Sequence, residues 1–329
     1  MTTLLLPSAF LIIGLILLVW SSDLFIDGAA SVSKHLSISP LIIGVVVLGF
    51  GTSAPEILVA ILASVDNSPG LAIGNVIGSN IANIALVLGV AAIISPIVVK
   101  SSLLKREFPI VLGITIIGYL LILDNDLDTT DGIILLVLLV IVMTWMIRAN
   151  KQVEGTDDPI ATDTVQELDD KEEIPLKKSI FILVGGLIVL IISAKLMVSG
   201  AVDIAKFFEI PDVIIGLTIV AIGTSLPELA AAITAAKKGE ADLMIGNILG
   251  SNLFNLLAVM AMPALLAPSI VDKTTLTLDY PIMLLLTIIM LALALPRNGK
   301  AVIGKKAGFI LSLSFVAYLV SLYFRTTGG

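Results

Sequence analysis

The 329-residue chain contains no cysteine and has one histidine, His35. Without cysteine the protein can form neither disulfides nor thiolate metal sites. One histidine cannot by itself build a histidine-based metal centre. We therefore interpret His35, which lies at an expected helix end, as a surface residue.

Charged residues are also scarce. They make up 14% of the chain, whereas hydrophobic residues make up 57% and the mean hydropathy is +1.11. A soluble protein of this length cannot bury so much apolar surface, so the composition indicates a multi-pass membrane protein. Runs such as LIIGVVVLGF (41–50) do not alternate apolar and polar residues as the strands of a membrane β-barrel do. The sequence therefore predicts an all-α integral membrane protein.

Ten apolar windows have about the length that a membrane-spanning helix needs. The first window follows no basic leader and is too long for a signal-peptide core, so we expect it to be a span. A polar, acidic connector separates the first five windows from the last five. We predict ten transmembrane helices, five in each of two repeats. The first repeat comprises residues 1–149 and the second residues 179–329, and an acidic linker of residues 150–178 joins them. The windows lie at 5–30, 40–65, 70–98, 108–123, 131–148, 179–207, 212–236, 242–267, 278–295 and 302–324.

The two halves of the chain are copies of each other, because residue n matches residue n+172 without a gap. Repeats of this kind determine the architecture of a chain. After five crossings the second copy must start on the opposite side of the membrane, so we predict two inverted five-helix repeats. Such folds hold their substrate near the midplane of the membrane, where broken helices from the two repeats meet. Matching pairs include Gly14 with Gly186, Glu56 with Glu228, Asn83 with Asn255 and Pro109 with Pro281.

The distribution of lysine and arginine predicts the orientation. The connectors after spans 1, 3, 5, 7 and 9 hold 15 of the 19 basic residues, and the opposite side holds three. The remaining one, Lys195, lies within span 6. Since basic residues favour the cytoplasmic side, we expect the linker to be cytoplasmic and both termini to lie outside a cell (inner) membrane.

The motif GTSAPE (51–56) interrupts the second apolar window. Gly51 breaks the helix, and Pro55 has no N–H, so a backbone carbonyl loses its helical partner. That carbonyl and the hydroxyls of Thr52 and Ser53 are hard oxygen donors of the kind that Ca²⁺ and Na⁺ bind. Glu56 lies in the first turn of the resumed helix, where the helix dipole favours a carboxylate.

The same motif returns as GTSLPE (223–228), with Thr224, Ser225 and Glu228 at the equivalent positions. Both motifs could be proline kinks that serve packing alone. A charge in the middle of a membrane costs about 2.5 kcal/mol or more, however, so such residues are functional by default. The two glutamates together carry a charge of −2, which suits one divalent cation.

A second doubled motif, GNVIGSNIAN (74–83) and GNILGSNLFN (246–255), follows each glutamate. Its polar residues recur every four positions and so line one helix face. They could form a packing ladder between helices, but their position beside the broken helices favours a role as ligand donors. The candidates from this motif are Ser79, Asn83, Ser251 and Asn255.

The two doubled motifs together resemble the alpha repeats of the sodium/calcium exchanger family, and the resemblance covers essentially the whole chain. It implies an antiporter whose glutamates bind Ca²⁺ and share sites with Na⁺. It also implies backbone carbonyl ligands in the turn before GTS. The implied ligands are Glu56, Glu228, Thr52, Thr224, Ser53, Ser225, Ser79, Ser251 and Asn83, with carbonyls at Gly49 and Ala221.

This chain departs from several family members at Asn255, where they carry aspartate. The departure makes potassium dependence less expected and leaves no central carboxylate for a proton. The related calcium/proton exchangers usually have Gly-Asn in place of GTS, which neither half of this chain has.

We interpret the chain as a secondary antiporter that exchanges Na⁺ for Ca²⁺, with a calcium/proton antiporter as the alternative and a passive cation channel as the more remote one. Two glutamates without histidine, cysteine or a lysine pair offer little chemistry to an enzyme. We expect a monomer that uses no cofactor, binds no nucleic acid and lies in a lipid bilayer.

Two charged features remain open. Asp23 and Lys195 occupy equivalent positions and could pair with each other, or each could reach polar surroundings near its own helix end. The acidic stretch 124–132 lacks the residues of a calcium-binding EF-hand loop, and we interpret it as an outer loop that attracts cations.

Overall fold

A computed structural model describes residues 2–99, 101–151, 174–209, 221–296 and 301–327 of the chain. These residues are mainly helical, and several helices contain a π-helical segment, labelled η. The first half contains, in order, α1 (Thr2–Leu36), α2 (Pro40–Ile42), η1 (Ile43–Leu48), α3 (Gly49–Thr52), α4 (Ala54–Val65), α5 (Pro69–Ala82), η2 (Asn83–Val87), α6 (Leu88–Ile94), α7 (Ser101–Lys105), α8 (Glu107–Leu121) and α9 (Thr129–Lys151).

The second half contains equivalent elements in the same order, with part of the linker region and residues 210–220 outside the described chain. Its helices are α11 (Leu176–Phe207), α13 (Ala221–Thr224), α14 (Leu226–Lys238), α15 (Ala241–Phe254), η5 (Asn255–Val259), α16 (Ala261–Leu266), η6 (Thr275–Asp279), α17 (Tyr280–Ala294) and α18 (Lys305–Thr327).

Eight helical stretches of the described chain are long and apolar enough to cross a membrane, which identifies a multi-pass membrane protein. Two of the ten expected spans are not among them. The window 108–123 coincides with α8, which has only 15 residues. The first part of the window 212–236 lies outside the described residues. Residues 152–173 of the linker also lie outside them. A total of ten spans therefore stays a prediction.

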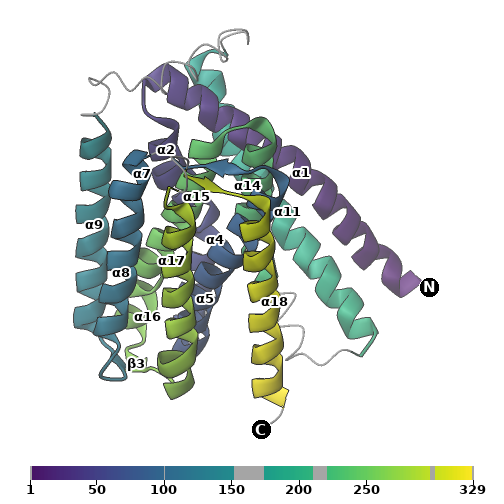
Figure 1. Cartoon of the computed structure of the whole chain (residues 1–329). Helices are drawn as coiled ribbons and strands as arrows, with labels where there is room; N and C mark the ends of the chain where they lie inside the picture. The colour runs from purple at the N-terminus through teal and green to yellow at the C-terminus, as the bar shows by residue number, and fades with distance from the viewer. Residues whose placement is uncertain (1, 100, 152–173, 210–220, 297–300, 328–329) are drawn as a thin grey trace.

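Two short β-ladders, which the sequence did not predict, join the halves. Strand β1 (Ile97–Val98) pairs antiparallel with β4 (Val302–Ile303), and β2 (Asp126–Leu127) pairs antiparallel with β3 (Ser269–Ile270). Each ladder thus combines one strand from each half. In Figure 1 the β1–β4 ladder lies near the upper ends of the helices and β3 lies at the lower end.

The long helices α1 and α11 lie side by side in Figure 1, and small residues allow their close contact. A Cβ atom on Gly14 would lie 2.7 Å from the backbone nitrogen of Met197. A Cβ atom on Gly186 would lie 2.7 Å from the backbone nitrogen of Phe25. Both pairs are related by the 172-residue shift, so the two helices make the same contact on each other.

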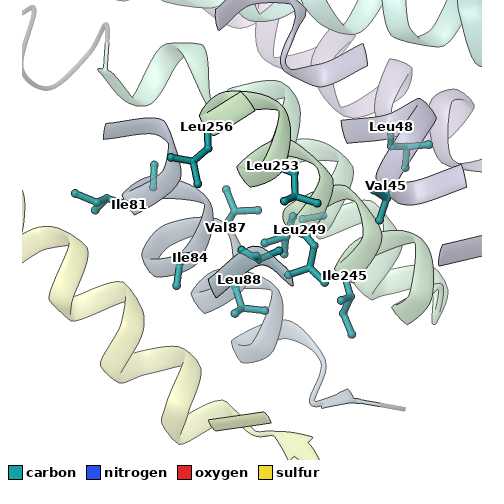
Figure 2. Packing of buried hydrophobic residues seen from close by; sticks show 14 of the residues in the cluster. Val45, Leu48, Ile81, Ile84, Val87, Leu88, Ile245, Leu249, Leu253 and Leu256 are labelled. Atoms are coloured by element: carbon teal, nitrogen blue, oxygen red, sulfur yellow. The ribbon is translucent and has the colours of Figure 1, made fainter. Parts of the chain in front are cut away.

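The interior is formed by α5–η2–α6 and α15–η5–α16, with the broken helix α2–η1–α3–α4 packed against α15. Figure 2 shows apolar side chains of both halves in one cluster. Ile81 and Ile84 of the first half lie in the same cluster as their equivalents, Leu253 and Leu256. The candidate ligands are carried by these central helices rather than by the outer ones.

The acidic loop before α9 is a helix cap. The Asp128 carboxylate accepts the backbone N–H groups of Thr130 and Asp131, at 2.6 and 3.0 Å. The Asp124 carboxylate accepts the N–H of Asp126 at 3.0 Å. Asp128 therefore caps the start of α9, as acidic residues commonly do, whereas Asp124 bonds to the start of strand β2 (Asp126–Leu127). His35 is exposed in the last turn of α1, as expected.

Candidate functional site

The helix is broken at both GTS-x-PE motifs, as the sequence predicted. Helix α3 ends at Thr52, and α4 begins at Ala54 after a non-helical Ser53 (φ −79°, ψ 0°). The second motif repeats this geometry at Ser225 (φ −90°, ψ 7°), between α13 and α14. Each glutamate thus lies in the first turn of a resumed helix, where backbone N–H groups and the helix dipole favour negative charge.

Glu56 and Glu228 are buried, with 1% and 0% of their surface exposed. No oxygen of either carboxylate forms a hydrogen bond within the described chain. The Ser79 hydroxyl lies beside Glu56 and the Thr52 hydroxyl lies beside Glu228, and the two carboxylates are close enough to repel each other. An unpaired buried charge is costly, so this arrangement calls for a positive partner.

The candidate residues of the second motif, Ser79, Asn83, Ser251 and Asn255, are also buried. In both halves the regular α-helix changes to a π-helical segment at the asparagine: η2 begins at Asn83 and η5 begins at Asn255. Such segments are frequent at functional sites because they redirect side chains and free backbone groups. The sequence did not predict them, since no residue pattern distinguishes them from α-helix.

Hydrogen bonds of Thr52 link the first motif of one half to the second motif of the other. Its hydroxyl lies 3.1 Å from the Leu48 carbonyl and 3.1 Å from the Asn247 amide oxygen. It also lies 3.2 Å from the Ser251 hydroxyl. Asn247 is not among the ligands predicted from the sequence, although it is the second residue of the GNILGSNLFN motif (246–255) and could have been found there.

Several further oxygens around the glutamates are buried and have no hydrogen-bond partner in the described chain. They are the hydroxyls of Ser53 and Ser225 and the amide oxygens of Asn83 and Asn255. Together with the carboxylates they form a set of hard oxygen donors contributed by both halves. Oxygen ligands of this kind suit Ca²⁺ and Na⁺, and the unmet hydrogen-bonding capacity fits a site that receives a cation.

The two implied carbonyl ligands can be located only in part. Gly49 packs against Gly250, whose backbone would lie 2.8 Å from a Cβ atom at this position. Its carbonyl accepts the N–H of Ser53 at 3.1 Å, which uses one of its two lone pairs. Ala221 is the first residue of α13, and its side chain is not among those that the structure describes.

Thr224 differs from its counterpart Thr52, because Thr224 is half-buried whereas Thr52 is fully buried. The expected equivalence of the two motifs is therefore incomplete at this position. Among the described residues no group of three or more histidine, cysteine, aspartate or glutamate side chains is arranged so that it could hold a metal ion. The site thus depends on two carboxylates and on neutral oxygens.

Comparison with known proteins points to the same family as the sequence motifs. The family described as "Sodium/calcium exchanger protein" matches residues 6–148 and 178–324. The putative antiporter CaxA of Alkalimonas amylolytica is 41% identical over 319 residues, which cover 97% of this chain and 99% of that protein. The inner membrane protein YrbG of Escherichia coli (strain K12) is 38% identical over 322 residues, which cover 97% of each chain.

A solved structure is similar over the same length. It is the sodium-calcium exchanger NCX_Mj soaked with 10 mM Na⁺ and 10 mM Sr²⁺, with a TM-score of 0.83 and 32% sequence identity. The match covers 97% of this chain and 99% of that chain. The similarity therefore extends over both motif pairs and both halves.

The site predicts that Ca²⁺ stabilises the purified protein in detergent. A ligand that binds only the folded state adds about 2.7 kcal/mol of stability at one hundred times its dissociation constant. Glu56→Gln and Glu228→Gln should each abolish most of the Ca²⁺-dependent rise in unfolding temperature. Without Ca²⁺ each variant should unfold at the same or a higher temperature than the parent, because one of two repelling carboxylates is gone.

The control for this experiment is Glu240→Gln, which removes a carboxylate at the start of α15 and should retain the Ca²⁺-dependent rise. Unfolding is followed by tryptophan fluorescence or calorimetry over a range of Ca²⁺ concentrations. A full rise in either Glu56→Gln or Glu228→Gln would exclude that glutamate from the site.

Proposed function

Because the chain belongs to the sodium/calcium exchanger family, we propose that it is a secondary antiporter that exchanges Na⁺ for Ca²⁺ across the membrane. The family is one of transporters rather than enzymes. The observation that carries the proposal is the set of buried, unpaired oxygens around Glu56 and Glu228. Since both halves supply this set, one chain is sufficient to form the site.

The charge of the site provides the coupling. Two carboxylates hold a charge of −2, which one Ca²⁺ or two Na⁺ neutralise. Since both ions need the same oxygens, each must leave before the other binds, and empty carboxylates are costly to bury. Exchange is therefore favoured over unaccompanied movement of either ion.

The proposed architecture is ten transmembrane helices in two inverted five-helix repeats, with the broken helices meeting near the midplane. Contacts that join the halves and are reproduced by the 172-residue shift support it. They are the α1–α11 glycine contacts and a pair of asparagine hydrogen bonds described below. The two β-ladders also join the halves, but β4 begins at Val302, beyond the position 298 that the shift gives for the start of β2.

One region departs from this symmetry. Lys238, at the end of α14, lies 2.8 Å from the Asp27 carboxylate and 3.4 Å from the Asp23 carboxylate of α1. The hydroxyls of Ser22 and Thr234 lie 2.7 Å apart and join the same two helices. Asp23 thus pairs with Lys238, and the pairing with Lys195 that the sequence left open is not observed.

The 172-residue shift relates Lys238 to Asp66 and Asp23 to Lys195. The counterpart ion pair, with its charges exchanged, would therefore join Asp66 at the end of α4 to Lys195 of α11. Both side chains are exposed, and no ion pair joins them in the described chain.

We propose that α1 and α11 move together between two states, one with the Lys238–Asp23 contact and one with the Asp66–Lys195 contact. This movement would open the site to each side of the membrane in turn.

Cysteine cross-linking tests this movement in a chain that has no cysteine of its own. We expect Asp23→Cys with Lys238→Cys, and Asp66→Cys with Lys195→Cys, to form cross-links in different states, each of which stops transport. Changing from Na⁺ to Ca²⁺ or reversing the gradients should raise the yield of one cross-link and lower that of the other. As a control, Val98→Cys with Val302→Cys links β1 to β4 and should leave transport unchanged. Transport that survives cross-linking of both proposed pairs would contradict the model of movement.

We propose that the protein lies in the inner membrane with both termini outside. The relative YrbG is named an inner membrane protein. The bias of 15 basic residues against three supports a cytoplasmic location for the linker.

Two exposed serines on successive connectors test this orientation. Ser37 follows α1 and Ser68 follows α4, and serine-to-cysteine substitution changes one atom at each. In intact cells an impermeant thiol reagent should label Ser68→Cys, whereas Ser37→Cys should be labelled only after the membrane is permeabilised. The opposite pattern would reverse the orientation.

We propose Na⁺ rather than H⁺ as the coupling ion, because the amide of Asn255 cannot take up a proton as an aspartate could. Two Na⁺ neutralise the glutamates, and a third would carry a net charge inward. Each such charge gains about 2.3 kcal/mol per 100 mV of membrane potential. Transport should therefore respond to voltage if more than two Na⁺ move per Ca²⁺.

Proteoliposomes distinguish the three candidate functions. Vesicles loaded with Na⁺ at matched pH should accumulate radioactive Ca²⁺ from outside, and vesicles with a pH gradient alone should not. Accumulation driven by the pH gradient alone would support a calcium/proton antiporter. Equilibration of Ca²⁺ without dependence on either gradient would support a passive channel.

A further inference from the structure

A second pair of buried asparagines lies beside the proposed ligands. Asn80 of α5 and Asn252 of α15 are each 1% exposed and are related by the 172-residue shift. The Asn83 amide donates from Nδ2 to Asn252 Oδ1 at 3.4 Å. The Asn255 amide donates from Nδ2 to Asn80 Oδ1, also at 3.4 Å. Each bond crosses from one half to the other, and the shift converts one bond into the other.

These bonds determine which end of each amide remains available. Asn83 and Asn255 use their nitrogen toward the partner helix, and their oxygens are buried without a hydrogen-bond partner in the described chain. A cation can be bound only by the oxygen of an amide. If either side chain turned over, its NH₂ group would face the ion and its oxygen would face another oxygen.

We propose that Asn80 and Asn252 are positioning residues of the ion site, which hold Asn255 and Asn83 with their oxygens toward the transported ion. This inference rests on the proposed function, because it assigns a role within that site. It also explains why an amide, rather than a carboxylate, is used as the acceptor. An amide orients its partner without adding to the site charge of −2.

The nitrogens of Asn80 and Asn252 are themselves buried without a partner in the described chain. Asparagines retained only for packing stability would be expected to satisfy their own hydrogen-bonding groups, because an unmet buried donor is destabilising. Mutation of residues that orient metal ligands typically lowers metal affinity about 10- to 100-fold.

The test measures the Ca²⁺ concentration that gives half of the thermal stabilisation and half of the maximal transport rate. Asn80→Leu keeps the side-chain volume and removes the acceptor, and it should raise both concentrations about tenfold or more. Asn252→Leu should have a similar effect because its environment is equivalent. Thr115→Val and Thr287→Val are matched controls: both threonines are buried, lie 172 residues apart and bond within their own helices. Neither control should change the half-saturating concentration.

A double-mutant comparison separates positioning from a structural effect. A carboxylate presents an oxygen in either orientation, so Asn255→Asp should make Ca²⁺ binding insensitive to Asn80→Leu. Asn83→Asp should not have this effect, because Asn83 bonds to Asn252 and not to Asn80. If Asn80→Leu does not fold, Asn80→Ala is measured in the same backgrounds.

Two outcomes would overturn the inference. One is an unchanged half-saturating concentration in the asparagine variants, with or without a lower unfolding temperature. The other is a rescue that follows Asn83→Asp as well as Asn255→Asp. The stabilisation assay requires no transport, so failure of Na⁺-driven uptake in the parent protein would refute the proposed function and leave the test of positioning intact.

Discussion

The burial of two carboxylates without partners is the constraint on which the rest of the structure depends. Glu56 and Glu228 are almost completely buried, and their oxygens form no hydrogen bonds in the described chain. In a membrane interior such charges are tolerated only where they are compensated. The helix breaks at Ser53 and Ser225 place the positive ends of two resumed helices at the glutamates, but partial charges do not replace a full positive charge. A cation bound between the glutamates, as the proposed function requires, would supply this compensation.

Bringing two such motifs together requires unusually close helix packing. Gly44 lies against Gly246 and Gly49 against Gly250, with spacing that leaves no room for a Cβ atom. These contacts hold the broken helix of the first half directly on α15, which carries Ser251 and leads into Asn255. Small residues are the usual means by which membrane helices approach closely, and here they bring buried oxygens of the two halves together.

Sequence reasoning predicted the features that depend on residue type and spacing. The apolar windows identified eight helices that are long enough to span a membrane, and Gly with Pro identified the two helix breaks at Thr52–Ala54 and Thr224–Leu226. It did not predict the π-helical segments at Asn83 and Asn255, because their backbone departs from α-helix through packing rather than through a local signal. It also overlooked Asn80, Asn247 and Asn252, which lie in the recognised motif. Their roles depend on contacts across the halves, and spacing within one helix does not show such contacts.

The central helices follow the 172-residue symmetry more closely than the outer helices do, and this difference bears on the mechanism. The asparagine bonds beside the proposed ion site obey the 172-residue relation, whereas the Lys238–Asp27 and Ser22–Thr234 contacts between α14 and α1 do not. Apart from the difference between Thr52 and Thr224, a proposed site with equivalent donors from both halves can present the same ligands to either side of the membrane. The outer helices, which meet each other through equivalent glycine contacts, can then differ in what they touch without disturbing the donors. If the central asparagine pairs keep their geometry, only the surrounding elements need to move. The proposed alternation of access therefore requires little change in the geometry that binds the ion.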